Sequence, residues 1–177
     1  VTDNVTITYT NAPTINAGTD QTLCQNNSDA TLAGSVSIAT GGIWSGGLGN
    51  FTPGNANLAT TYTPTVSEIA SGSITLTLTS TGNGNCRAVT DNLVLNYTAA
   101  PVVNAGADVA VCANNSAVSL NGSVSGAGGG VWLGGAGTFS PGNNSLTATY
   151  TPSAAEIAAG SVTLTLESTG NGNCLAE

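Results

Sequence analysis

The chain has 177 residues and a formal net charge of −8, and only 6% of its residues are charged. Arg87 is its only basic residue, so the chain cannot neutralise a row of phosphates, which makes nucleic acid and anionic membrane surfaces poor partners. No apolar run approaches the roughly 20 residues of a membrane-spanning helix, so membrane insertion is not expected. Apolar residues make up 40% of the chain and alternate with polar ones, which favours a folded β-rich protein over a disordered one.

The sequence consists of two copies of one unit, offset by 88 residues, the separation of Cys24 from Cys112. The copies align without a gap, and 54 of the 88 aligned pairs are identical. Solenoid repeats are shorter, about 20–50 residues. A unit of 88 residues is large enough to be a small domain with its own core, so the sequence predicts an array of domains.

Each copy contains a series of short segments with the alternation of β-strands. In chain order, strands are expected at residues 1–10, 19–24, 30–37, 42–45, 50–52, 60–63, 73–80 and 89–98, and at the equivalent places in the second copy. In residues 73–80, for example, Ile74, Leu76 and Leu78 share one face and threonines share the other. Clusters of Gly and Asn separate the strands and favour turns. The pattern predicts an antiparallel β-sandwich in each repeat.

One short helix is expected in each repeat, between the strands at residues 60–63 and 73–80 and at the equivalent place in the second copy. A Thr or Ser stands three residues before a Glu, which is the spacing of a capping box, and a Gly follows to end the helix. These residues are Thr65, Glu68 and Gly72, and Ser153, Glu156 and Gly160. We therefore interpret both glutamates as helix caps, with metal ligation as the alternative.

Two proline-containing segments mark domain junctions, since proline blocks the continuation of a strand. They begin at Asn11 and Ala99. Residues 12–98 then form a complete domain, and residues 99–177 form a second one that lacks its own last strand. Residues 1–10 are predicted to be the last strand of a preceding repeat. Since the repeats are equivalent, we expect the two domains to be related by a nearly pure screw along the chain.

Each repeat holds two cysteines, 62 residues apart in sequence number, as in Cys24 and Cys86. No CxxC motif is present, so a zinc ribbon or a thioredoxin-like site is unsupported. Cysteine pairs of this kind favour disulfides in an oxidising compartment. We predict bonds within each repeat, Cys24 with Cys86 and Cys112 with Cys174. The alternative that also respects the repeat is Cys86 with Cys112 across the junction.

The sequence offers little catalytic chemistry. It contains no His and no Lys, so the usual bases for nucleophilic catalysis are missing, and we predict that the chain is not an enzyme and has no cofactor. Calcium is the one chemical alternative, because Asp20, Asp91 and Asp108 supply oxygen ligands near the junctions. EF-hand spacing is absent, and solvated turn residues are the other interpretation.

Trp44 and Trp132 lie among glycines, which raises the question of a binding surface. A tryptophan on a central strand of a sandwich usually belongs to the core, which is the interpretation we favour. The alternative is an exposed ring that stacks on a sugar. Each repeat would then be a carbohydrate-binding module that grips polysaccharide.

Several long runs resemble the immunoglobulin-like and PKD-like tandem repeats of giant secreted cell-surface adhesins of gliding bacteria, of the Bacteroidota type. They are NAGTDQTLCQNNSDATLAGS with its second copy NAGADVAVCANNSAVSLNGS, GGIWSGGLGNFTPGN, YTPTVSEIASGSITLTLTSTGNGNC and VTDNLVLNY. The resemblance covers the whole chain. It implies immunoglobulin-like sandwiches of about seven strands, type IX secretion and an extracellular, cell-surface location.

The same resemblance implies a structural stalk or filament that extends an adhesive tip, in gliding motility or surface attachment. Its partners would be neighbouring repeats, with surface polysaccharide or other filament chains as further candidates. A third alternative follows from the domain boundaries. Residues 1–10 of another chain could supply the last strand that residues 99–177 lack, giving a strand-exchange polymer.

Overall fold

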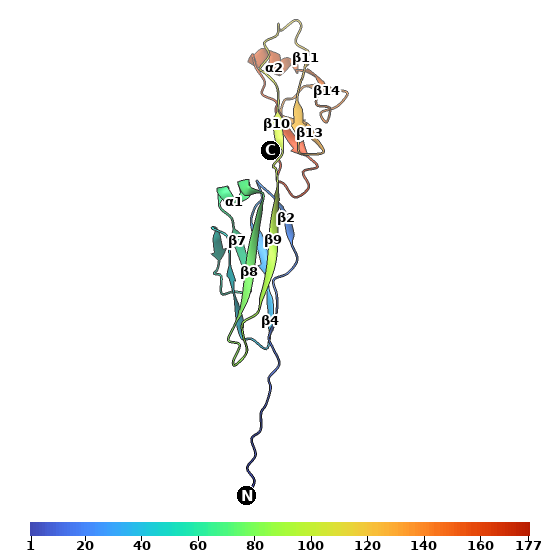
Figure 1. The fold of residues 1–177 in the computed structure, drawn as a ribbon. Coiled ribbons are helices and arrows are strands. Elements are labelled where there is room, and N and C mark those ends of the chain that lie inside the picture. The colour runs from blue at the N-terminus through green and yellow to red at the C-terminus, as the bar shows by residue number, and fades with distance from the viewer. The chain divides into compact units, whose positions relative to one another are not determined.

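The computed structural model describes residues 1–177 and divides them into two compact units, Val1–Thr98 (unit 1) and Ala99–Glu177 (unit 2). Apart from one short helix in each unit, the regular structure is β-strand (Figure 1). The predicted all-β class and the single helix per repeat are confirmed. Both helices are six residues long, far too short to cross a membrane.

Unit 1 is a sandwich of two sheets, with strand orders β2-β9-β8-β5 and β3-β7-β6. The strands are β2 (Gln21–Cys24), β3 (Ala30–Ala33), β5 (Gly41–Ser45), β6 (Asn50–Thr52), β7 (Ala59–Thr63), β8 (Ser73–Thr81) and β9 (Thr90–Thr98). A small ribbon pairs β1 (Thr14–Asn16) with β4 (Ser35–Ser37). Every pairing is antiparallel except that of β2 with β9, which is parallel. The two sheets contain seven strands, as expected for an immunoglobulin-like sandwich.

The core of unit 1 follows from the alternation along its two longest strands. Strand β8 buries Ile74, Leu76 and Leu78, which share one face. Strand β9 buries every second residue as well, Leu93, Leu95 and Tyr97. Each aliphatic side chain of this kind contributes about 1.5–3 kcal/mol when it is removed from water. The last strand is therefore an integral part of the core.

Unit 2 repeats only part of this architecture. Its strands form a ribbon of β10 (Val102–Asn104) and β12 (Ser123–Ser125), a sheet of β11 (Val118–Ser119), β15 (Thr149–Thr151) and β14 (Thr138–Ser140), and a pair of β13 (Gly129–Leu133) and β16 (Thr165–Thr169). No strand of unit 2 corresponds to β2 or β9. Strand β16 has five residues where its counterpart β8 has nine.

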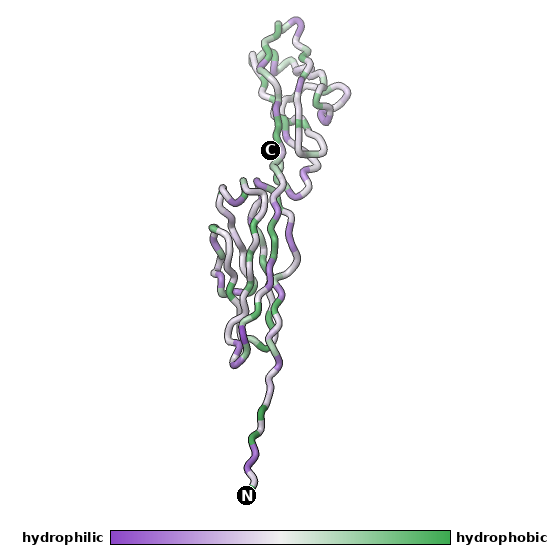
Figure 2. Tube along the Cα trace, in the orientation of Figure 1, coloured by the Kyte–Doolittle hydropathy of each residue, from purple (hydrophilic) through white to green (hydrophobic).

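Residues 1–10 form no regular strand in unit 1. Hydrophobic and hydrophilic residues alternate along this N-terminal segment (Figure 2). Val5, Ile7 and Tyr9 are 86%, 68% and 90% exposed. Their assignment to a preceding repeat stays a prediction, as does the screw relation between the two domains.

Candidate functional site

The carboxylate of Glu68 accepts four hydrogen bonds within unit 1. It belongs to helix α1 (Val66–Ser71) and completes the predicted capping box with Thr65, which is confirmed. The Tyr62 hydroxyl and the backbone N–H of Leu48 each donate to Oε1 at 2.6 Å. The N–H and the hydroxyl of Thr65 both donate to Oε2 at 2.8 Å. The carboxylate therefore joins the helix to strand β7 and to the loop after β5.

This network shifts the pKa of its acidic groups in opposite directions. Burial alone would raise the pKa of Glu68, but the hydrogen bonds that it accepts outweigh burial and hold this pKa below its ordinary value of 4.5. Burial and the hydrogen bond to Glu68 raise the pKa of Tyr62 to about 12. At neutral pH the carboxylate is ionised and the phenol is protonated. Because the Tyr62 hydroxyl and the Glu68 carboxylate are hydrogen-bonded to each other, this pair of residues has a structural role.

Unit 2 repeats the network around Glu156 on helix α2 (Ala154–Ala159), where the capping box with Ser153 is also confirmed. The backbone N–H groups of Ala136 and Ser153 lower the pKa of Glu156 to about 2. Tyr150 donates to the same carboxylate at 2.8 Å. Sequence analysis identified the glutamates but missed the tyrosines. The available signal was a Tyr six residues before the capping Glu in both copies.

Both tryptophans lie in the cores. Trp44 is fully buried and Trp132 is 2% exposed. Their indole N–H groups donate to the backbone carbonyls of Leu58 and Leu146, at 3.2 and 3.4 Å. Neither ring presents a face on which a sugar could stack.

The three aspartates considered as calcium ligands have separate surroundings. Asp20 accepts a hydrogen bond from the backbone N–H of Val94 at 2.8 Å. Asp91 accepts one from the N–H of Ala17 at 2.8 Å. Asp108 is exposed. No group of three or more His, Cys, Asp or Glu side chains gathers anywhere in the structure, and calcium binding stays an untested alternative. In unit 1, the aspartates fasten strand β9 to the segment that leads into β2.

The cysteines depart from the predicted pairing. Cys24 and Cys174 are disulfide-bonded, and Cys86 and Cys112 are free thiols. The predicted bonds within each repeat, and the alternative bond between Cys86 and Cys112, are therefore wrong for this structure.

The direction of strand β2 explains why a bond within unit 1 cannot form. Because β2 runs parallel to β9, Cys24 lies beside Thr98, at the end of β9. Cys86 precedes the start of β9, and its Sγ lies 3.5 Å from the carbonyl oxygen of Asn11. The nine residues of β9 span about 25–30 Å. A disulfide requires Cα atoms about 4.4–6.8 Å apart.

The two cysteines of a repeat thus lie at opposite ends of the sandwich, each beside a junction. Cys86 lies near Thr10 and Asn11, which precede the domain core, and Cys24 lies near Thr98, which follows it. Unit 2 repeats the first of these positions, because the Sγ of Cys174 lies 3.6 Å from the carbonyl oxygen of Ala99.

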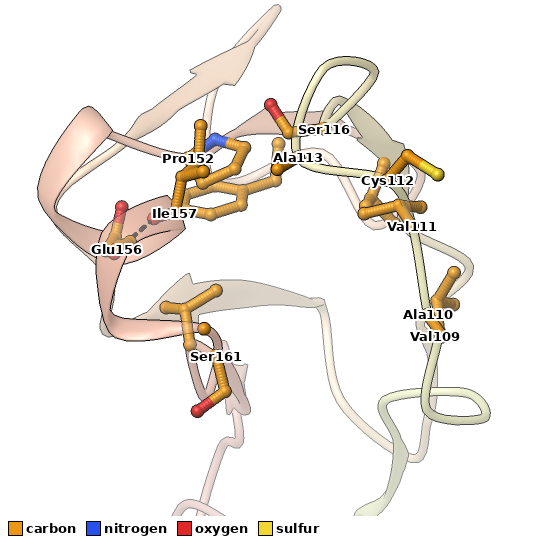
Figure 3. A pocket seen from close by; sticks show the side chains of 14 residues that line it. Val109, Ala110, Val111, Cys112, Ala113, Ser116, Pro152, Glu156, Ile157 and Ser161 are labelled. Atoms are coloured by element: carbon orange, nitrogen blue, oxygen red, sulfur yellow. Dashed lines mark hydrogen bonds between the residues drawn. The ribbon is translucent and has the colours of Figure 1, made fainter.

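Unit 2 carries an open groove where unit 1 carries strand β9. The groove has a volume of about 410 Å³ and lies between the segment that contains Val109 and Val111 and the end of helix α2 (Figure 3). Val109, Val111 and Val162 line it and are partly exposed, at 62%, 49% and 38%. In unit 1 the counterpart of Val162, Ile74, is only 7% exposed and lies opposite Leu95 of β9. We call this feature the unit 2 groove.

The two units are thus all-β sandwich repeats, the second with an open edge. No protein-family model and no curated protein matches the chain. Among solved structures, it is similar to protocadherin gamma B2 extracellular cadherin domains 3–6, with 13% identity and a TM-score of 0.38. It is also similar to the protocadherin gammaB7 EC3-6 cis-dimer structure, with 12% identity and a TM-score of 0.37.

Both similarities cover 93% of this chain, which spans 45% and 44% of the length of those two chains. They are too distant to bear on what this chain binds or does.

Proposed function

We propose that the chain is a tandem-repeat segment of a structural stalk or filament, part of a large extracellular adhesin that extends an adhesive tip from the cell surface. Gliding motility or surface attachment is the setting that the sequence resemblance implies. The observation that carries the proposal is the tandem arrangement of two equivalent repeats, each of which forms a compact all-β unit. A row of small independent domains of this kind suits a molecule that spans a distance.

The disulfide-bonded state of Cys24 and Cys174 bears on where the protein works. Disulfides persist in oxidising compartments such as the outside of the cell and are rare in the cytosol. Their presence supports an extracellular location.

The side chains that could have contacted a ligand instead make hydrogen bonds within the protein or are buried in its core. The carboxylates of Glu68, Asp20 and Asp91 accept backbone hydrogen bonds within unit 1. The indoles of Trp44 and Trp132 are buried. These uses support a stalk over a repeat that itself grips polysaccharide.

Solution scattering combined with a glycan array tests the proposal. A stalk should be extended, with a radius of gyration well above the roughly 16 Å of a compact protein of 177 residues. It should also bind no glycan on the array. A radius near 16 Å would contradict the stalk, and saturable glycan binding would favour the polysaccharide-binding alternative.

A further inference from the structure

Asparagine is followed directly by glycine at three places in the chain, and the structure gives these three pairs different surroundings. The pairs are Asn83-Gly84, Asn121-Gly122 and Asn171-Gly172. In such a pair the backbone nitrogen of the glycine can attack the side-chain amide of the asparagine, since glycine has no side chain that hinders the approach. The reactivity of each pair in the folded protein therefore depends on how freely its glycine can move.

Gly84 lies in the β-turn that follows strand β8. The backbone N–H of Cys86 donates to the carbonyl oxygen of Asn83 at 3.0 Å and closes this turn. Gly84 is the first central residue of the turn and has a φ of +59°, the positive value that turns of type I′ and II′ require at that position. The turn geometry therefore explains why a glycine follows Asn83, and Gly172 has the same φ in the second repeat.

Both of these glycines are exposed and loosely surrounded. A Cβ atom added to Gly84 or to Gly172 would meet no other atom within 4 Å. Neither glycine donates its backbone N–H to another group of the protein. Their backbone nitrogens are therefore open to solvent and can lose a proton to hydroxide.

The side-chain amides of the two asparagines are each held at one atom only. The Nδ2 of Asn83 donates to the carbonyl oxygen of Ser80 at 3.1 Å, while its Oδ1 accepts no hydrogen bond from the protein. Asn171 repeats this arrangement, with its Nδ2 3.2 Å from the carbonyl oxygen of Ser168. One hydrogen bond of modest net strength leaves the amide able to turn its Cγ toward the glycine nitrogen.

The third pair is held rigidly. Gly122 is buried, and its N–H donates to the carbonyl oxygen of Leu146 at 3.0 Å. A Cβ atom added to Gly122 would lie 2.7 Å from the Leu166 side chain and 2.8 Å from that of Trp132. The nitrogen of Gly122 therefore cannot attack Asn121 unless this part of unit 2 opens.

We propose that Asn83 and Asn171 are sites of spontaneous deamidation in the folded protein, and that Asn121 is protected from it. The deprotonated nitrogen of Gly84 attacks the Cγ of Asn83, which closes a cyclic imide and releases the amide nitrogen as ammonia. Water then opens the imide at either carbonyl and gives aspartate or isoaspartate. The net reaction consumes one water, converts one amide into a carboxylate and an ammonium ion, and involves no oxidation or reduction. This inference does not depend on the stalk role.

The modification weakens the turn in which it occurs. A carboxylate oxygen in place of Nδ2 cannot donate to the carbonyl of Ser80, a residue that is only 2% exposed. The backbone N–H of Ser80 donates to the carbonyl of Val89, whose own N–H donates to the Ser80 hydroxyl. Deamidation of Asn83 should therefore destabilise the connection between β8 and β9.

Timed incubation of the full chain at mildly alkaline pH tests the proposal. Peptides that each contain one of the three pairs are analysed by mass spectrometry for conversion of amide to acid. In the folded chain, Asn83 and Asn171 should convert at least about tenfold faster than Asn121, because Asn121 reacts only through a local opening of unit 2. In the reduced chain unfolded in urea at the same pH, the three pairs should convert at similar rates, since no folded structure distinguishes them.

A matched pair of substitutions tests the effect on the turn. Asn83→Asp introduces the product carboxylate at the reactive position and should lower the urea midpoint of unit 1, followed by Trp44 fluorescence in a Trp132→Phe background. Asn85→Asp puts the same charge at an exposed position of the same turn and should leave the midpoint unchanged.

Three results would each overturn the proposal. They are equal rates at the three pairs in the folded chain, no conversion of Asn83 and Asn171 until the chain is unfolded, and a difference between the pairs that persists in urea. An unchanged midpoint for Asn83→Asp would overturn the effect on the turn. Conversion that is selective for Asn83 and Asn171 in the folded chain, with the selectivity lost on unfolding, would support the proposal.

Discussion

At the scale of single residues, the few carboxylates of this protein accept hydrogen bonds from the backbone and so stabilise its conformation. Glu68 is one of only nine acidic residues, and it is buried with four hydrogen-bond donors around its carboxylate. A buried carboxylate is stable only when it is satisfied in this way. The same residue caps helix α1 and positions the loop after β5. Its replacement should therefore destabilise both segments.

Replacing Glu68 by Gln should lower the free energy of unfolding of unit 1 by about 1.5–3 kcal/mol at pH 7, the range for hydrogen bonds to a charged group. The amide NH₂ is a donor that would face other donors. Urea denaturation followed by Trp44 fluorescence in a Trp132→Phe background measures the change. Asp3→Asn, which removes an exposed charge, is the matched control and should have little effect.

The difference between wild type and Glu68→Gln should depend on pH. Because the folded-state pKa of Glu68 lies below 4.5, its stabilisation is present above pH 4.5 and is lost as the pH falls through the folded-state value. The two unfolding free energies should therefore converge in acid. A difference that stays constant from pH 7 to pH 3 would contradict the assignment.

Tyr62 should control part of the stability in alkali. Burial and Glu68 raise its pKa from 10.0 to about 12, so the stabilisation that comes with the protonated phenol is present below pH 10 and is lost as the pH rises from 10 to 12. Tyr62→Phe should make the alkaline loss of stability less steep. Burial also raises the pKa of Tyr97 to about 12, so Tyr97 should account for the alkaline loss of stability that persists in this variant. Urea midpoints between pH 9 and pH 11.5 measure this slope, and Tyr9→Phe at an exposed position should leave it unchanged.

At the scale of strands and helices, the sequence predicted the elements well where the signal is local. Alternation located β8 and β9, and the Thr65–Glu68 spacing located helix α1, because side-chain faces and caps depend on neighbouring residues. It did not predict that β2 pairs in parallel with β9. Alternation defines the face of a strand but carries no information about its partner or direction, and the error in the cysteine pairing followed from this gap.

The candidate site was recovered from sequence only in part for the same reason. The segment around Val109 has the sequence of a strand but adopts none, because the strand that its counterpart β2 pairs with has no equivalent in unit 2. Strand formation there depends on a contact between distant residues. The expectation that residues 99–177 lack a last strand came from aligning the repeats, while the groove itself was visible only in three dimensions.

Equivalent positions in the two strand-like segments should differ sharply in their effect on stability. Leu95→Ala removes a fully buried side chain from β9 and should cost unit 1 about 2–5 kcal/mol. Ile7→Ala changes the counterpart of the same repeat position, which is 68% exposed, and should leave the unfolding of the monomer unchanged. Both are measured by the Trp44 denaturation assay. Equal losses would show that residues 1–10 contribute to the core of unit 1.

At the scale of the whole molecule, the disulfide assignment is tested by peptide mapping without reduction, after the free thiols are alkylated. Cys86 and Cys112 should be alkylated, whereas Cys24 and Cys174 should be protected until the protein is reduced. A linked Cys24–Cys86 peptide would require strand β9 to open, because the two residues lie beside its opposite ends. Its detection in the native protein would contradict the topology of unit 1.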